Sequence, residues 1–214
     1  MLKAVLLASC MTIVCAVPAA AQTAMPGSGG QTTVTVSAQN DYRFERLAET
    51  IPGAVANVEL NHDVGNGISF NAWAQAGESK LAHELDLTVT GTKAFGIVEA
   101  SLTAGTYLVR DTEPIYVVTA TASIPISESV SLDYQVDHFE GGFEETTHSV
   151  AVSGIVGNAS LSAGKAHNAR SGLDPWFATA SVPIFGDSGF SLELKGYWGA
   201  GDDQGVTLGI SRTF

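Results

Sequence analysis

The sequence predicts an all-β fold, a transmembrane antiparallel up-and-down β-barrel of about twelve strands. Three observations lead to this prediction. After Val17 no apolar stretch is long enough for a membrane helix, although 45% of the residues are hydrophobic and only 15% are charged. Short segments of alternating apolar and polar residues recur along the chain, separated by Gly, Asp, Asn and Pro. The connections between these segments alternate between tight turns and longer or more charged loops.

The N-terminus has the three parts of a secretory signal peptide. Met1-Leu2-Lys3 is a short basic start, Ala4 to Val17 is an apolar run of 14 residues, and Pro18-Ala19-Ala20-Ala21 offers an Ala-x-Ala cleavage site. The run is shorter than the about 20 residues that a transmembrane helix needs. We therefore expect a signal peptide at residues 1–21, a flexible leader at residues 22–31 and one barrel domain at residues 32–214.

Cysteine content and charge exclude several functions. Cleavage after Ala21 would remove both cysteines, Cys10 and Cys15, so the mature chain would hold no disulfide, thiol nucleophile or Cys-ligated metal. The formal net charge of the whole chain is −12. Such an acidic chain has no electrostatic footprint for nucleic acid, which is not expected as a partner. No cofactor is predicted.

About twelve strands follow the leader. They are expected at about residues 32–39, 54–61, 67–75, 81–91, 96–109, 115–124, 129–138, 146–155, 158–166, 176–184, 189–198 and 205–214. An even number of strands places both termini on the periplasmic side of a bacterial outer membrane, and the tight turns fall on that side without adjustment. The longer connections, such as Asn40 to Gly53 and His167 to Pro175, are then the outer loops.

Each expected strand has one apolar and one polar face. In the segment 129–138, for example, Leu132 and Tyr134 share the apolar face, whereas Asp133 and Asp137 share the polar one. A carboxylate facing the middle of a lipid bilayer is costly, so the polar faces are expected to point inward. The charged residues expected to line the lumen are Glu59, Glu84, Asp86, Glu99, Asp133, Asp137, Glu193 and Lys195. A soluble β-sandwich would show the same alternation with its polar face in water.

Aromatic residues near the outer strand ends are expected at the bilayer interface. They are Tyr42, Phe44, Tyr107, Trp176 and Trp198. Trp73 has the parity of the polar face, which indicates either a ring inside the lumen or an error of register.

The last strand ends the chain on an aromatic residue, Phe214, which shares the apolar face with Val206, Leu208 and Ile210. This ending resembles the C-terminal signature of bacterial outer-membrane β-barrels, which the barrel assembly machinery recognises. The resemblance implies Phe214 as an assembly signal, with the assembly machinery, outer-membrane lipid and lipopolysaccharide as partners. Arg212 departs from the signature, but a long cationic stem near the periplasmic rim can snorkel.

Residues 40–75 carry a second resemblance. Asp41, Tyr42 and Phe44 match the opening pattern Ser/Asn-Asp-Tyr-x-Phe-Arg-Gly-x-Ser-Gln, whereas Glu45 and Arg46 stand where that pattern has Arg-Gly. With the second strand and the Gly-led third strand that follow, this start resembles the TorF-family porins of proteobacteria. The resemblance implies a porin-type barrel in a Gram-negative bacterium, and it carries over no catalytic residues.

The inward carboxylates predict what the barrel transports. If water fills the lumen, an excess of carboxylates favours cations over anions. The sequence therefore predicts a porin-like channel for passive, weakly cation-preferring passage of small solutes. One alternative is a closed structural or adhesive barrel that acts through its acidic outer loops, with the carboxylates plugging a narrow lumen. A membrane hydrolase is a further alternative.

Neither catalysis nor metal binding has a recognisable motif. Two adjacent pairs are candidates for catalytic couples, Asp137-His138 and His148-Ser149. In each pair the two side chains point to opposite faces of the strand, so neither pair is a catalytic couple. No nucleophile elbow occurs, and we predict no enzyme. The outer-loop acids could bind Ca²⁺ or Mg²⁺, but they lack the spacing of a calcium loop, so a solvated acidic surface is expected. These acids are Asp111, Glu113, Glu140, Glu144, Glu145, Asp202 and Asp203.

Overall fold

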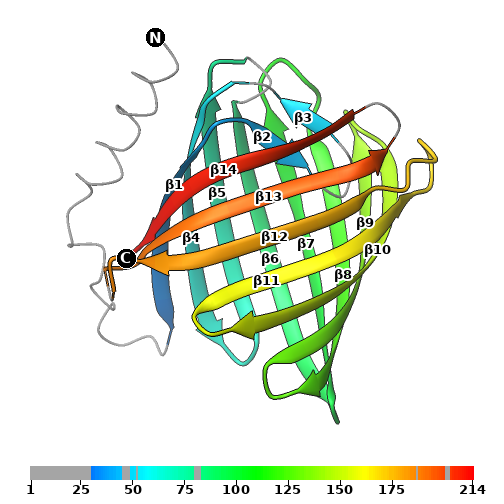
Figure 1. Ribbon diagram of the computed structural model, residues 1–214. Coiled ribbons are helices and arrows are strands. Elements are labelled where there is room, and N and C mark those ends of the chain that lie inside the picture. The colour runs from blue at the N-terminus through cyan, green and yellow to red at the C-terminus, as the bar shows by residue number, and fades with distance from the viewer. Residues whose placement is uncertain (1–29, 45–48, 52, 80–82, 187, 201–202) are drawn as a thin grey trace.

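Twelve strands form a closed antiparallel barrel (Figure 1). The computed structural model describes residues 30–44, 49–51, 53–79, 83–186, 188–200 and 203–214. The barrel strands are β1 (Gln31–Gln39), β4 (Val55–Gly65), β5 (Ile68–Gly77), β6 (Glu84–Phe95), β7 (Val98–Val109), β8 (Ile115–Ser127), β9 (Val130–Gly141), β10 (Glu145–Val156), β11 (Ala159–Asn168), β12 (Trp176–Ile184), β13 (Phe190–Ala200) and β14 (Asp203–Thr213). The predicted fold class and strand number are confirmed.

Each barrel strand pairs with the next one in sequence, and β1 pairs with β14 to close the barrel. This closing seam has five paired positions, from Thr35–Thr213 to Gln39–Gly209, whereas β1 and β4 pair at nine positions. Two hydrogen bonds lengthen the seam. The N–H of Val34 donates to the carbonyl of Phe214 at 3.2 Å, and the N–H of Phe214 donates to the carbonyl of Val34 at 2.8 Å. Closure leaves no free sheet edge, as a backbone surrounded by lipid requires.

The two ends of the barrel differ in their connections. At one end, termed the turn end, the short connections 66–67, 96–97, 128–129, 157–158 and 185–189 join the strands. Strand β1 begins and β14 finishes at this end. The opposite end, termed the loop end, carries the connections 40–54, 78–83, 110–114, 142–144, 169–175 and 201–202. The connection expected at residues 139–145 is shorter than predicted, because β9 continues to Gly141 and β10 begins at Glu145.

The turn between β4 and β5 depends on glycine. Gly67 has a φ of +75°, in the left-handed region, and a Cβ at this position would lie 2.2 Å from the carbonyl oxygen of Thr92. The preceding Asn66 also has a positive φ, of 55°. Asn-Gly is the favoured sequence for a two-residue hairpin turn with both φ angles positive, so the sequence itself sets this turn.

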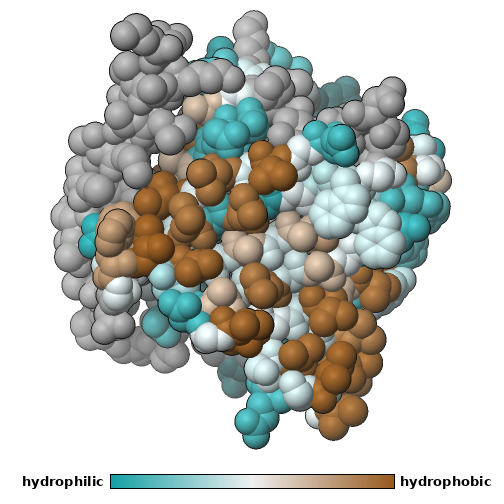
Figure 2. Space-filling model, viewed as in Figure 1, coloured by the Kyte–Doolittle hydropathy of each residue, from teal (hydrophilic) through white to brown (hydrophobic). Residues whose placement is uncertain are grey.

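The barrel is apolar outside and polar inside. Leu87, Val118 and Leu194 point outward and are 44–47% exposed, and Figure 2 shows apolar residues spread over the face that β11 to β14 form. Asp137 and Thr147 point inward and are at most 7% exposed. This inside-out distribution is that of barrels that cross a lipid bilayer, and the soluble sandwich is excluded.

A short antiparallel pair, β2 (Tyr42–Phe44) and β3 (Glu49–Ile51), lies within the first connection of the loop end. Strands of three residues are too short to show an alternation pattern, so this pair could not be predicted from the sequence. The part that the structure describes leaves out the expected signal peptide and most of the leader. It also leaves out Asp202 and the side chains of Tyr42, Phe44 and Asp203. Within the described ranges, no helix is long and apolar enough to cross a membrane.

Candidate functional site

A cavity of about 660 Å³ occupies the centre of the barrel. Side chains from every barrel strand except β14 line it, so it is the lumen rather than a surface groove. Five of the eight charged residues predicted for the lumen lie on its wall: Glu59, Asp86, Asp137, Glu193 and Lys195. Four carboxylates and one ammonium group therefore face the central cavity.

A second cavity, of about 680 Å³, lies at the turn end of the barrel, between residues that include Ser131 and Glu128. It shares four lining residues with the central cavity: Ser162, Thr179, Glu193 and Lys195. The two cavities therefore adjoin. Glu193 and Lys195 lie two residues apart on β13 and stand at the junction.

Carboxylates and aromatic rings alternate along one side of the lumen. Glu59 on β4 pairs with Trp73 on β5, Trp73 pairs with Asp86 on β6, and Asp86 pairs with Tyr107 on β7. All four residues line the central cavity, and together they are termed the carboxylate–aromatic row. Neighbouring strands lie about 4.8 Å apart, so the backbone positions of Glu59 and Asp86 lie about 10 Å apart, with Trp73 on the strand between them.

Hydrogen bonds hold two of the lumen carboxylates in the wall. Asn71 Nδ2 donates to Glu59 Oε1 at 2.6 Å. Thr119 Oγ1 and Gln135 Nε2 both donate to Asp137 Oδ1 at 2.7 Å. These contacts fix the positions of the two carboxyl groups on the lumen wall.

Asp86 has a different environment. A second carboxyl group, that of Glu84, lies two residues away on the same face of β6. Glu84 is buried and lies beside the cavity rather than on its wall. Among the described residues, Asp86 Oδ1 and the cavity-lining Asn57 Oδ1 are buried without a hydrogen-bond partner.

The remaining two predicted lumen residues lie toward the turn end, outside the lining of the central cavity. Asp133 accepts hydrogen bonds from Ser123 Oγ at 2.6 Å and Ser131 Oγ at 3.0 Å. Glu99 is the second residue of β7, pairs with Ser123 across the sheet and is exposed. The structure therefore separates these two carboxylates from Asp86 and Asp137.

The predicted place of Tyr107 in the interfacial belt is wrong. Its ring lines the lumen, with its centroid 6.3 Å from that of Phe139, because it shares the inward face of β7 with Thr103. Trp176 and Trp198 pair across β12 and β13, and both are outward and about half exposed, as the prediction requires. The polar parity of Trp73 reflects a ring inside the lumen and not an error of register.

Two further aromatic residues of the lumen were missed at the level of sequence. Phe139 and Phe177 both line the central cavity. Their inward position could have been predicted from the strand alternation, because Phe139 shares a face with Asp137 and Phe177 shares one with Thr179. An aromatic residue on a polar face is therefore informative in this chain.

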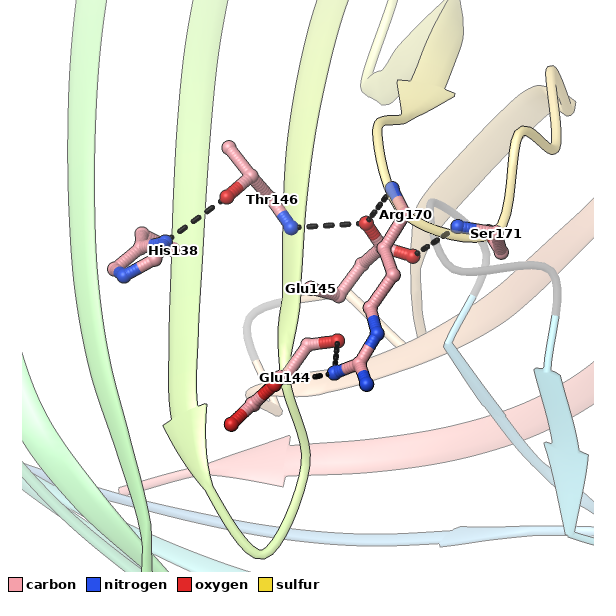
Figure 3. Close-up of polar contacts among 6 residues, drawn as sticks. All are labelled: His138, Glu144, Glu145, Thr146, Arg170 and Ser171. Atoms are coloured by element: carbon pink, nitrogen blue, oxygen red, sulfur yellow. Dashed lines mark hydrogen bonds and ion pairs between the residues drawn. The ribbon is translucent and has the colours of Figure 1, made fainter.

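Glu145 anchors the 169–175 connection to the loop end (Figure 3). Its Oε1 accepts the backbone N–H of Thr146 at 2.9 Å and of Arg170 at 2.7 Å, and its Oε2 accepts that of Ser171 at 3.0 Å. Burial raises the pKa of Glu145, but these backbone donors outweigh it and hold the pKa below its ordinary value. Glu145 was expected on a solvated acidic surface and is instead 6% exposed, since it caps the loop backbone.

Replacing Glu145 by Gln is expected to loosen this connection. Gln keeps one acceptor oxygen but turns an NH₂ group toward N–H donors, and a hydrogen bond to a charged group contributes about 1.5–3 kcal/mol. The amides of Arg170 and Ser171 should therefore exchange with deuterium at least about tenfold faster. The exposed Glu144, which pairs with Arg170 Nη1 at 2.5 Å, gives the control Glu144→Gln, for which little change is expected. Equal effects of the two variants would contradict the anchor.

The depressed pKa of Glu145 predicts the pH dependence of the same contact. A carboxylate whose pKa is lower in the folded state stabilises that state fully above its ordinary pKa. Its contribution is lost as the pH falls through the lower, folded pKa. In the parent protein, protection of Arg170 and Ser171 should therefore fall only in strongly acidic buffer, whereas Glu145→Gln should show weak protection at every pH.

The histidines and those loop acids whose side chains the structure describes do not line the central cavity. His148 Nδ1 lies 2.9 Å from Tyr134 Oη, and His167 Nδ1 lies 2.8 Å from Asp174 Oδ1, in both cases at exposed positions. The hydrogen bond from His167 holds the pKa of Asp174 below its ordinary value. In the part of the chain that the structure describes, no three His, Cys, Asp or Glu side chains are grouped to hold a metal ion.

A closed antiparallel barrel with an apolar outside and a charged lumen defines a porin-type fold. The KdgM porin has this fold, with a TM-score of 0.68 and 7% identity over 85% of this chain and 99% of that one. The NanC porin matches with a TM-score of 0.61 and 8% identity, over 85% and 98%. An outer membrane channel from Pseudomonas putida F1 matches with a TM-score of 0.56 and 13% identity, over 92% and 99%.

These identities are low, so the likeness is one of fold. No protein-family model and no curated protein matches the sequence. The resemblance of residues 40–75 to the TorF family therefore stays a prediction.

Proposed function

We propose that this chain is an outer-membrane channel for passive passage of small solutes, with a weak preference for cations. The observation that carries the proposal is a carboxylate-lined lumen cavity that adjoins a second cavity at the turn end, inside an apolar barrel. In this proposal the turn end and both termini face the periplasm, since bacterial barrels have short periplasmic turns. Outer-membrane lipid and lipopolysaccharide surround the barrel, and a TorF-family origin is part of the proposal.

The charge of the lumen supports the cation preference. Four carboxylates and one ammonium group line the central cavity, and fixed negative charge raises the local concentration of cations. One of the structural neighbours is a KdgM porin in complex with disordered oligogalacturonate. A uronate carries negative charge, so we do not expect that ligand to enter this lumen readily. No catalytic step is assigned to the chain.

Conductance of the refolded mature barrel in a planar bilayer tests the proposal. Discrete openings with a cation-directed reversal potential under a KCl gradient are expected, and Asp137→Asn together with Asp133→Asn should weaken that preference. Asp174→Asn is the matched control, because it removes a carboxylate at an exposed position away from the lumen cavity. An anion-directed potential would contradict the charge argument. A folded but silent barrel would mean a plugged lumen and would favour the alternative that the acidic loops bind a partner.

A further inference from the structure

The carboxylate–aromatic row carries two kinds of group that recognise different parts of one ligand. The carboxylates of Glu59 and Asp86 attract positive charge. The rings of Trp73 and Tyr107 offer apolar contact to carbon atoms and, on their faces, attraction for a cation within about 6 Å. A small hydrated metal ion would use only the carboxylates. A positively charged organic molecule would use all four residues.

The spacing of the row favours two charges on one ligand. Glu59 and Asp86 flank Trp73 on consecutive strands, so the backbone positions that carry the two carboxylates lie about 10 Å apart along the row. A linear diammonium compound with charges at about this separation can place one ammonium group at each carboxylate. Its methylene chain then crosses the indole of Trp73, where burial of CH₂ groups is favourable.

Two acceptors buried on the lumen wall have no hydrogen-bond donor among the described residues. Asn57 lies two residues before Glu59 on the same face of β4, lines the cavity and is only 4% exposed. Its Nδ2 donates to Ser37 Oγ at 3.1 Å, whereas its Oδ1 has no partner among the described residues. Asp86 Oδ1 is also buried without a hydrogen-bond partner among the described residues. Buried acceptors are normally satisfied, and an ammonium group brings three N–H donors.

We infer that the carboxylate–aromatic row, with Asn57, is a binding site for organic ammonium compounds, and above all for linear diammonium ions. The inference rests on the proposed function, of which it names the solute class. Glu59 and Asp86 hold the two charged ends, and Trp73 lies under the chain that joins them. Tyr107 contacts the end that Asp86 binds.

Fluorescence of Trp73 tests binding without requiring conduction. The chain has three tryptophans, so a Trp176→Phe, Trp198→Phe parent leaves Trp73 as the only indole. This parent, folded in detergent micelles, is titrated with hexane-1,6-diamine at constant ionic strength. A saturable change in emission is expected. Hexane-1,6-diol, which has the same chain without charge, should cause none.

Charge variants in the same parent assign the site. Asp86→Asn and Glu59→Gln should each weaken diamine binding by about tenfold, and Asp174→Asn should leave it unchanged. Each variant is first shown to be folded by its gel migration without heating. No saturable change in the parent, an equal response to the diol, or unaltered binding by both lumen variants would overturn the inference.

Planar-bilayer recordings separate this inference from the proposed function. Binding of the diamine to a barrel that never conducts would leave the site standing and overturn the channel. Cation-preferring conduction without diamine binding would support the channel and overturn the binding site. Conduction that the diamine blocks, with the block weakened by Asp86→Asn, would support both.

Discussion

Reversing single charges at the junction of the two lumen cavities is expected to change the ion preference in opposite directions. Glu193→Lys would leave two ammonium groups there, and Lys195→Glu would leave two carboxylates. A unit charge acts on an ion about 10 Å away by roughly 1.5 kcal/mol at an effective dielectric constant near 20. Each substitution changes the charge by two units, so we expect Glu193→Lys to lower the cation-to-anion permeability ratio by at least about tenfold and Lys195→Glu to raise it.

Reversal potentials under a KCl gradient measure both variants. Glu193→Gln should fall between the parent and Glu193→Lys, because it removes the charge without reversing it. The shifts should shrink at high salt, where screening is stronger. Asp174→Lys makes the same reversal at an exposed position away from the lumen and should leave the potential unchanged. Shifts of the same sign in Glu193→Lys and Lys195→Glu would show that the junction is not on the conduction path.

Strand periodicity explains why so much of the barrel could be predicted. Side chains alternate with a period of two, so the parity of Leu132 and Asp133 separates the lipid face from the lumen without any knowledge of the neighbouring strands. The same rule places Glu59, Asp86, Asp137, Glu193 and Lys195 inside. It also places Trp73 inside, where the sequence left two interpretations open. The count of strands followed from the recurring alternating segments and from the alternation of tight turns with longer connections.

Register could not be predicted, because it depends on where each turn falls. The sequence suggested a turn at 92–95, whereas β6 continues to Phe95 and the chain turns at residues 96–97. This difference decides which residues of β6 and β7 lie opposite each other, and so decides that Tyr107 pairs with Asp86. The carboxylate–aromatic row is therefore a property of the paired sheet and is invisible in any one strand.

The loop anchor escaped prediction for a different reason. Glu145 acts through backbone N–H groups of residues about 25 positions away along the chain. Such contacts leave no periodic pattern in the sequence, and an acidic residue beside a loop is usually solvated.

The environment of Phe214 joins the end of the chain to the closing seam. Its side chain is 8% exposed and packs with Val36, Val34 and Phe190. The guanidinium of Arg212 lies 4.9 Å from the centroid of Phe190 and 4.4 Å from that of Phe214, a cation–π arrangement between two rings. Arg212, which departs from the expected C-terminal signature, therefore has its guanidinium group between two aromatic rings. Phe190 therefore makes the same contact with Arg212 as Phe214 does, but it lies within the chain and not at its end.

Replacing Phe214 by Ala is expected to lower the amount of barrel in the outer membrane far more than replacing Phe190 by Ala. Each change removes one ring from the same cluster and one partner of Arg212, so each should lower the free energy of unfolding in micelles by about 1–2 kcal/mol. Only Phe214→Ala also removes the terminal aromatic residue that the resemblance of this ending assigns to the assembly machinery. Urea unfolding measures the first effect, and quantitative blotting of outer-membrane fractions measures the second. Equal depletion of both variants would mean that Phe214 acts through stability alone, because the two rings would then differ in nothing that the cell detects.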